Sequence, residues 1–245
     1  MKENQVRVTI PASARLLLQR VGASAEAQGL SAYAVGGCVR DWCRGITAVK
    51  DLDVTIEGDG IALARQLAQL LGATVTAHAP FGTATLRLPG GQGRLDIASC
   101  RKEVYKRSAA YPTVSAGTLE DDLFRRDFTV NAMALALNPG RFGTLIDPFH
   151  GAEDLRRKCL RILHERSFLD DPSRILRGVR FAQRFRLRWE RGSRRAALDA
   201  LAAQALSWLN AGRLRREMER ILDEPDPLAC LRQLRGFLDA SRKRR

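Results

Sequence analysis

The sequence has no long apolar run and no export signal, and both absences exclude classes of protein. No stretch approaches the roughly 20 apolar residues needed to cross a bilayer, so we expect no membrane-spanning segment and no membrane partner. The first 20 residues, MKENQVRVTIPASARLLLQR, contain neither an uninterrupted apolar core nor a convincing cleavage site, which argues against a secretory signal. We therefore expect a cytoplasmic protein.

Cysteine and histidine are scarce, and their spacing excludes the common metal and disulfide frameworks. The chain has 5 cysteines without a CxxC pair, and its 3 histidines lie far from any two of them. This pattern disfavours a zinc site and a disulfide scaffold. We expect reduced thiols that act as small core residues.

Acidic residues are also few, since 27 Asp and Glu face 41 Lys and Arg, giving a formal net charge of +14. Residues 1–150 hold 17 basic and 14 acidic side chains, whereas residues 151–245 hold 24 and 13. A basic excess in the last 95 residues favours a polyanionic partner such as nucleic acid or nucleotides. The alternative is a solvated basic face that serves solubility.

Hydrophobic periodicity predicts an α+β protein in two parts. The first part, 1–150, has strand patterns at 31–35, 51–57, 74–79, 82–88 and 93–99, helices at 12–28 and 60–71, and a helical pattern from 117 through the apolar run 130–137. A turn at 147–151 marks the boundary. The second part, 151–245, predicts helices at 153–158, 168–186, 193–206, 211–223 and 227–240 and a frayed basic tail at 241–245.

The first part carries three features that suit phosphate chemistry. Gly36 and Gly37 follow a strand and precede a helix that contains Arg40, so backbone and guanidinium could approach an anion. Asp51 and Asp53 alternate with apolar residues on a strand and should share one face, where two carboxylates can hold metal ions about 4 Å apart. A simple turn and a surface acidic pair are the alternatives.

Two further positions extend this set. Asp96, inside the apolar strand 93–99, is the candidate third carboxylate that helps to place a metal and to orient or deprotonate an attacking hydroxyl. The alternative is an Asp that faces solvent on an edge strand. Arg126 suits a phosphate, and Asp127 suits either a helix cap or a ribose hydroxyl.

The segment DDPSRILRGVR in the second part opens a helix whose arginines repeat every three residues. Arg174, Arg177 and Arg180 should therefore share one broad face, which could be a solvated stripe. An Asp acceptor at Asp171 followed by an Arg donor at Arg174 can also imitate the hydrogen-bonding edge of a base-pair partner.

Four motifs in order, AYAVGGCVRDWCRGITAVKDLDVTI, RLDIASCRKEVY, LEDDLFRRDFTVNAMAL and SFLDDPSRILRGVRFA, resemble those of the class II tRNA nucleotidyltransferases and the related bacterial poly(A) polymerases. The resemblance covers about residues 30–190. It implies a DNA polymerase β-like nucleotidyltransferase head with a mixed sheet, at 1–150, followed by an all-helical neck, at 151–245, that selects the base and binds RNA.

The resemblance also implies roles for individual residues. Gly37 and Arg40 would bind the triphosphate, and Arg126 would bind the nucleotide, as would Gly36 of the same glycine pair. Asp51 and Asp53 would hold two Mg²⁺ ions, and base selection would fall to the neck residues Asp171 and Arg174, with Arg177 and Arg180 nearby. The enzyme would add C, A or both from CTP or ATP to the 3′ end of tRNA or another RNA and release pyrophosphate.

Two departures from the family pattern qualify this expectation. The Glu-Asp pair of the family is Asp170-Asp171 in this chain, and because the sequence stops at Arg245, we expect the family's body and tail domains to be missing. RNA would then be bound by neck arginines such as Arg213 and Arg216 and by the basic tail, or a partner protein would supply the rest. A poly(A) polymerase and a non-catalytic RNA-binding relative are the alternative functions, and a binding module has no reason to keep the Asp51-Asp53 pair.

Overall fold

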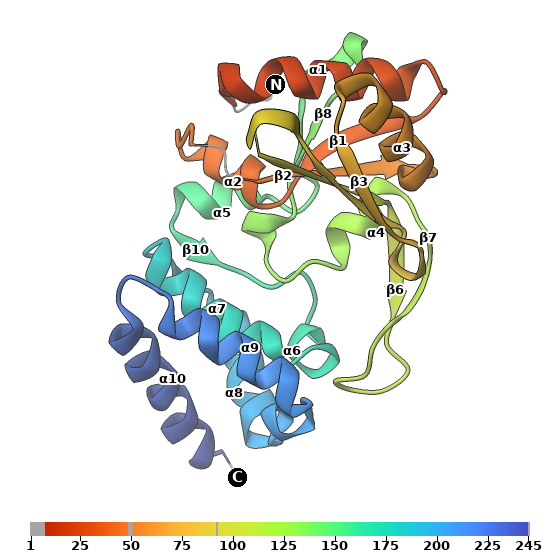
Figure 1. Cartoon of the computed structure of the whole chain (residues 1–245). Coiled ribbons are helices and arrows are strands. Elements are labelled where there is room, and N and C mark those ends of the chain that lie inside the picture. The colour runs from red at the N-terminus through yellow and green to blue at the C-terminus, as the bar shows by residue number, and fades with distance from the viewer. Residues whose placement is uncertain (1–7, 49–50, 92, 245) are drawn as a thin grey trace. The chain divides into compact units, whose positions relative to one another are not determined.

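The chain, seen in a computed structural model that describes residues 8–48, 51–91 and 93–244, divides into two units (Figure 1). The first unit comprises Met1–Glu103, Val114–Arg126 and Val130–Ala152, and the second comprises Val104–Thr113, Asp127–Thr129 and Glu153–Arg245. Residues 104–113 and 127–129 thus belong to the second unit, although the chain on either side of each segment belongs to the first.

A seven-stranded sheet forms the centre of the first unit, in the order β3-β4-β5-β2-β1-β8-β9. The pair β2 and β5 is parallel, and the other neighbouring strands are antiparallel, so the sheet is mixed and the α+β prediction is confirmed. The strands are β1 Ser31–Val35, β2 Asp51–Glu57, β3 Thr74–His78, β4 Thr83–Arg87, β5 Arg94–Ser99, β8 Ala134–Ala136 and β9 Leu145–Ile146.

Helices α1 (Ala12–Glu26) and α3 (Gly60–Leu71) pack on this sheet, α1 against β1 and α3 against β4 and β5. Helix α3 begins where the Asp59 carboxylate accepts the N–H groups of Ile61 and Ala62, and it ends at Gly72 in the left-handed conformation. The short helix α2 (Gly37–Cys43) follows β1. The short helix α4 (Leu119–Phe124) directly precedes the Arg125-Arg126 pair.

The predicted helix through residues 130–137 is wrong, because this apolar run contains strand β8. The side chains of residues 130–137 are buried, and β8 pairs with β1 on one side and β9 on the other. A short run that is buried on all sides has no periodicity to distinguish strand from helix. A separate two-stranded sheet, formed by β6 (Arg101–Val104) and β7 (Thr113–Ala116), was not predicted.

The second unit is mainly helical. Helix α5 (Gly151–Arg156) begins in the first unit and ends in the second. The helices that follow it in the second unit are α6 Ser167–Asp170, α7 Ser173–Arg184, α8 Arg191–Ala202, α9 Ala211–Leu222 and α10 Pro227–Arg242. The prediction that this part is all-helical is wrong, since β10 (Cys159–Leu160) and β11 (Arg188–Trp189) pair in parallel. The predicted helix 168–186 is interrupted at Asp171, whose backbone is extended (φ −136°, ψ 92°) because the following Pro172 disfavours a helical conformation there.

Apolar side chains from α7, α9 and α10 form one buried cluster in the second unit, namely Leu176, Val179, Ile221, Cys230 and Leu234. Gly178 is required where α7 meets Trp189, because a Cβ at Gly178 would lie 2.4 Å from the indole ring. Helix α10 continues to Arg242 and buries Ser241 at 2% exposure, so the predicted fraying from residue 241 is wrong. Arg245 lies outside the described residues.

None of the helices in the described ranges combines the length and apolar character that a membrane span requires.

Candidate functional site: a carboxylate face with glycine and arginine

Strand β2 presents two carboxylates on the face that its apolar residues leave open. Leu52 and Val54 are 4% and 1% exposed, whereas Asp51 and Asp53 are exposed, as the alternation predicts. The parallel ladder with β5 sets Asp53 opposite Asp96 in register. The sheet therefore brings the three acidic residues that the sequence singled out onto neighbouring positions of one face.

Arg94 joins two of these carboxylates. Its Nε lies 2.9 Å from Asp96 Oδ2 and 3.5 Å from Asp51 Oδ1, and Thr85 on β4 donates its hydroxyl to Asp96 Oδ1 at 2.6 Å. Asp96 therefore has a cation on one oxygen and a hydroxyl donor on the other. The Arg94 guanidinium thus compensates part of the negative charge that Asp51 on β2 and Asp96 on β5 bring together.

The electrostatics at Asp53 suit a cation. Desolvation raises the pKa of Asp53, the Arg126 guanidinium lowers it, and the neighbouring Asp96 and Asp51 raise it, with a net upward shift. A positive ion at this face would relieve the repulsion that raises the pKa. Within the described ranges, no group of three or more His, Cys, Asp or Glu side chains is arranged so that it could hold a metal ion. Asp51 and Asp53 are the carboxylates of this face that could hold an ion, and the metal site remains a prediction.

Gly36 brings the backbone, an arginine and this carboxylate face together. It caps α2 with φ 72° and ψ −127°, a conformation that side-chain-bearing residues rarely adopt. A Cβ at Gly36 would lie 2.7 Å from Arg126 Nη1 and 4.0 Å from Asp53 Oδ2. Only glycine therefore allows Arg126 to lie against the turn beside Asp53.

Arg126 is held at one end of its guanidinium. Its Nη2 donates to Asp122 Oδ2 at 2.9 Å, whereas its Nε is buried and has no hydrogen-bond partner among the described residues. A buried donor without a partner costs free energy unless an acceptor arrives. The side chain that the sequence assigned to the nucleotide thus has unused donor capacity beside Gly36.

Arg40 is more strongly engaged than the sequence indicated. It is 8% exposed, donates from Nη1 to Asn131 Oδ1 at 2.6 Å and pairs with Asp41 at 3.0 Å. Gly37, at the first position of α2, would place a Cβ 3.6 Å from Arg40 Nη2, an ordinary contact distance. The triphosphate roles of Gly37 and Arg40 remain predictions.

The second unit holds Asp171 at the start of α7. Its Oδ1 accepts the Ser173 N–H at 3.0 Å and the Ser173 hydroxyl at 2.6 Å, and it pairs with Arg213 Nη2 at 2.6 Å. A pocket of about 300 Å³ opens here, lined by Asp171, Ser173, Arg177, Arg213, Arg216, Glu217 and Arg220. Arg213 is therefore part of a polar pocket, and its side chain, only 16% exposed, is a poor candidate for the RNA phosphate contact that the sequence suggested.

The three arginines of α7 differ in their surroundings, so they do not form one solvated stripe. Arg174 is 5% exposed and donates to the Ser167 hydroxyl at 2.7 Å. Arg177 pairs with Asp127 at 2.6 Å, and the Asp127 carboxylate raises the pKa of Arg177.

Arg180 is buried between Glu224 at 2.9 Å and Glu217 at 3.4 Å, and its desolvation lowers the pKa of its guanidinium. These contacts give Arg180 a clear part in holding α7 in place.

Sequence reasoning missed the pairing roles of Asp122, Arg94 and Arg213. Asp122 precedes Arg125 and Arg126 by three and four residues, which is the helical spacing of an ion pair, so a local signal was available. Arg94 and Asp96 are two apart on one strand and share a face, which was a second signal. Arg213 lies 42 residues beyond Asp171, and no local pattern links them.

Comparison with known proteins identifies the family. The protein-family model of the poly(A) polymerase head domain matches residues 32–161, which is more than half of the chain. The chain belongs to this family. It is 42% identical to an A-adding tRNA nucleotidyltransferase of Halalkalibacterium halodurans over 221 residues, 89% of this chain and 51% of the relative.

Two other relatives support the assignment. A CC-adding tRNA nucleotidyltransferase of Deinococcus radiodurans is 38% identical over 203 residues, 83% of this chain and 53% of the relative. A solved structure of a CCA-adding enzyme in an apo form superposes with a TM-score of 0.88 at 40% identity, covering 94% of this chain and 54% of that one. The chain thus spans about half the length of these relatives.

Proposed function

We propose that this chain is a template-independent nucleotidyltransferase that adds C, A or both from CTP or ATP to the 3′ end of tRNA and releases pyrophosphate. In this proposal residues 1–150 form the head domain and residues 151–245 form a base-selecting, RNA-binding neck. The relatives supply the substrate class, since they are named A-adding and CC-adding tRNA nucleotidyltransferases.

One observation carries the proposal: Gly36 allows the Arg126 guanidinium to lie within reach of the carboxylate face at Asp53. A triphosphate needs cationic and N–H donors, and nucleotidyl transfer needs carboxylates for metal ions, so the two requirements meet in one part of the first unit. Gly37 and Arg40, at the start of α2, extend the proposed triphosphate contacts.

The metal we propose is Mg²⁺, held by Asp51 and Asp53. When bound there, it supplies positive charge to the phosphate oxygens and to the attacking hydroxyl. The exposed carboxylates, the raised pKa of Asp53 and the oxygen-only donor set support a hard cation.

The reaction that these residues serve is an in-line displacement. The 3′ hydroxyl oxygen of the RNA forms a bond to the α-phosphorus, the bond from that phosphorus to the bridging oxygen breaks, and pyrophosphate leaves. Asp96, opposite Asp53 in register, accepts the hydroxyl proton or orients the hydroxyl. Arg126 donates to the phosphate oxygens from the end of its guanidinium that lies against Gly36.

Base choice we assign to Asp171 and Arg174, with Arg177 and Arg180 in support. Cytosine and adenine both present an exocyclic amino group beside a ring-nitrogen acceptor, so a carboxylate acceptor and a guanidinium donor suit both. The pocket lined by Asp171 and Arg177, and the Arg213 pair that fixes Asp171, support this assignment.

RNA binding we assign to exposed basic residues of the second unit, in the cytoplasm, with a partner protein as a further source of RNA contacts. The net charge of residues 151–245, +11, supports an electrostatic interaction. A poly(A) polymerase is the second candidate, because the matched family model is named for that activity.

A substrate panel tests the proposal. The protein is incubated with Mg²⁺, each of the four labelled nucleoside triphosphates, and tRNA that lacks one, two or three terminal nucleotides. We expect incorporation of C, A or both that stops at the completed end. Long A tracts would favour the poly(A) polymerase, and absence of incorporation with every substrate would reject both enzyme assignments.

A further inference from the structure

Helix α4 places one carboxylate between two consecutive arginines. Thr118 and Asp121 form reciprocal capping hydrogen bonds that fix the first turn, and Asp122 follows on the inner side of the helix at 0% exposure. Its Oδ1 accepts from Arg125 at 2.6 and 3.1 Å, and its Oδ2 accepts from Arg126 at 2.9 Å. Each oxygen of Asp122 thus binds a different guanidinium.

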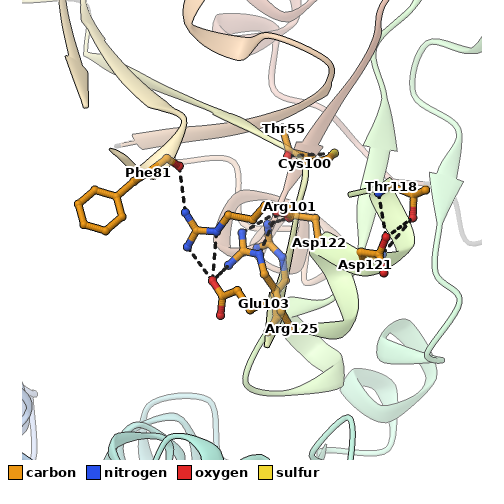
Figure 2. Close-up of polar contacts among 10 residues, drawn as sticks. Thr55, Phe81, Cys100, Arg101, Glu103, Thr118, Asp121, Asp122 and Arg125 are labelled. Atoms are coloured by element: carbon orange, nitrogen blue, oxygen red, sulfur yellow. Dashed lines mark hydrogen bonds and ion pairs between the residues drawn. The ribbon is translucent and has the colours of Figure 1, made fainter. Parts of the chain in front are cut away.

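The contacts on the far side of Arg125 hold this carboxylate in position. Figure 2 shows Arg125 between Asp122 and Glu103, and Glu103 also accepts from Arg101. The Arg101 guanidinium in turn donates to the Phe81 carbonyl at 3.2 Å. A series of alternating charges therefore anchors Asp122 to the backbone near β4, and Asp122 has little freedom to follow Arg126 if Arg126 moves.

The buried Asp122 carboxylate is charged and pairs with both arginines. Burial alone would raise the pKa of Asp122, but Arg126 and Arg125 outweigh burial and lower it, so the carboxylate is ionised. Arg101 and Arg125 share Glu103, whereas Asp122 also pairs with the Arg126 guanidinium, whose Nη1 lies against Gly36.

We infer that Asp122 is a positioning residue for nucleotide binding: it fixes the Arg126 guanidinium beside Gly36 and Asp53, where Arg126 meets the phosphates. The inference rests on the proposed function and adds a residue to it. Arg126 makes the contact, and Asp122 determines where that contact is made. A carboxylate that merely stabilised α4 would have no reason to act through Arg126.

A double-mutant cycle tests the inference. Asp122→Asn keeps the size of the side chain and removes its charge, and we expect the Kd for MgATP or MgCTP, measured by calorimetry without RNA, to rise about 10- to 100-fold. In an Arg126→Gln background the same substitution should change the Kd less than about twofold, because the residue through which it acts is gone.

The design includes a second variant and a control. Asp122→Glu keeps the charge but shifts it by one methylene, so we expect a smaller rise in Kd that also disappears in the Arg126→Gln background; it serves where Asp122→Asn does not fold. Glu120→Gln, on the exposed side of the same helix, should bind nucleotide like the wild type.

The outcomes separate the inference from the proposed function. Equal losses of affinity in both backgrounds, or wild-type affinity for Asp122→Asn, would overturn the positioning role while leaving nucleotide binding by the wild type in place. Wild-type protein that binds neither nucleotide would overturn the proposed function and the inference together.

Discussion

Replacing Gly36 by alanine separates backbone strain from loss of the site. The φ of 72° and ψ of −127° at Gly36 should cost an alanine about 1–3 kcal/mol of folding free energy. The new methyl group would also lie 2.7 Å from Arg126 Nη1, so the guanidinium must move away from Asp53. Because a misplacement of about 1 Å can reduce a rate about 100-fold, we expect nucleotide transfer to fall by about that factor.

Gly29→Ala is the matched control. Gly29 has a similar φ of 67°, but a Cβ added at Gly29 would have no atom within 4 Å. The control should therefore lose about 1–2 kcal/mol from strain alone and transfer nucleotides at the wild-type rate. Urea denaturation gives the change in stability, and incorporation of labelled CTP or ATP into truncated tRNA gives the rate. Equal rates for Gly36→Ala and wild type would refute the close approach of Arg126 as the basis of the site.

Three further predictions concern the carboxylates and the basic surface. Asp171→Ala should weaken discrimination among the four nucleoside triphosphates at least about tenfold while changing triphosphate affinity little, and unchanged preference would leave Asp171 with a capping role only. The raised pKa of Asp53 means that its charged form is less favourable in the folded than in the unfolded protein. Asp53→Asn should therefore match or exceed the wild-type Tm at pH 7 without metal, and this advantage should shrink as pH falls through the pKa of Asp53. A clear loss of Tm would contradict that reasoning. Each phosphate contact adds about 0.7–0.9 to the slope of log affinity for tRNA against log salt concentration. Arg191→Glu and Arg232→Glu, at surface positions, should therefore each flatten this slope by about that amount. A Kd for tRNA that does not depend on salt would exclude electrostatic binding.

The sequence allowed the order of elements around the carboxylates to be predicted because alternation is a local signal. Asp51 and Asp53 lie on one exposed face of β2 since the intervening residues must be buried. The sequence predicts helix at Ala134–Ala136, where the structure has a strand, because a run that is buried on all sides lacks that alternation.

Contacts between distant residues could not be read from local patterns. The pairing of Asp171 with Arg213, and of Arg180 with Glu217 and Glu224, depends on how α7 and α9 pack, which local periodicity does not determine. The Asp122 pairs with Arg125 and Arg126 are the opposite case, because helical spacing alone predicts them once α4 is recognised.

The most direct test of the central claim compares single-turnover transfer by wild type and by Asp53→Asn. Both proteins, at equal concentration and with their folding checked by circular dichroism, receive MgCTP or MgATP and tRNA that lacks its terminal nucleotides. We predict that the wild type extends the 3′ end and that Asp53→Asn is slower by at least about 100-fold, because the carboxylate face supplies the electrostatic stabilisation of the transferred phosphate. Equal extension by the two proteins, or no extension by the wild type, would contradict the account.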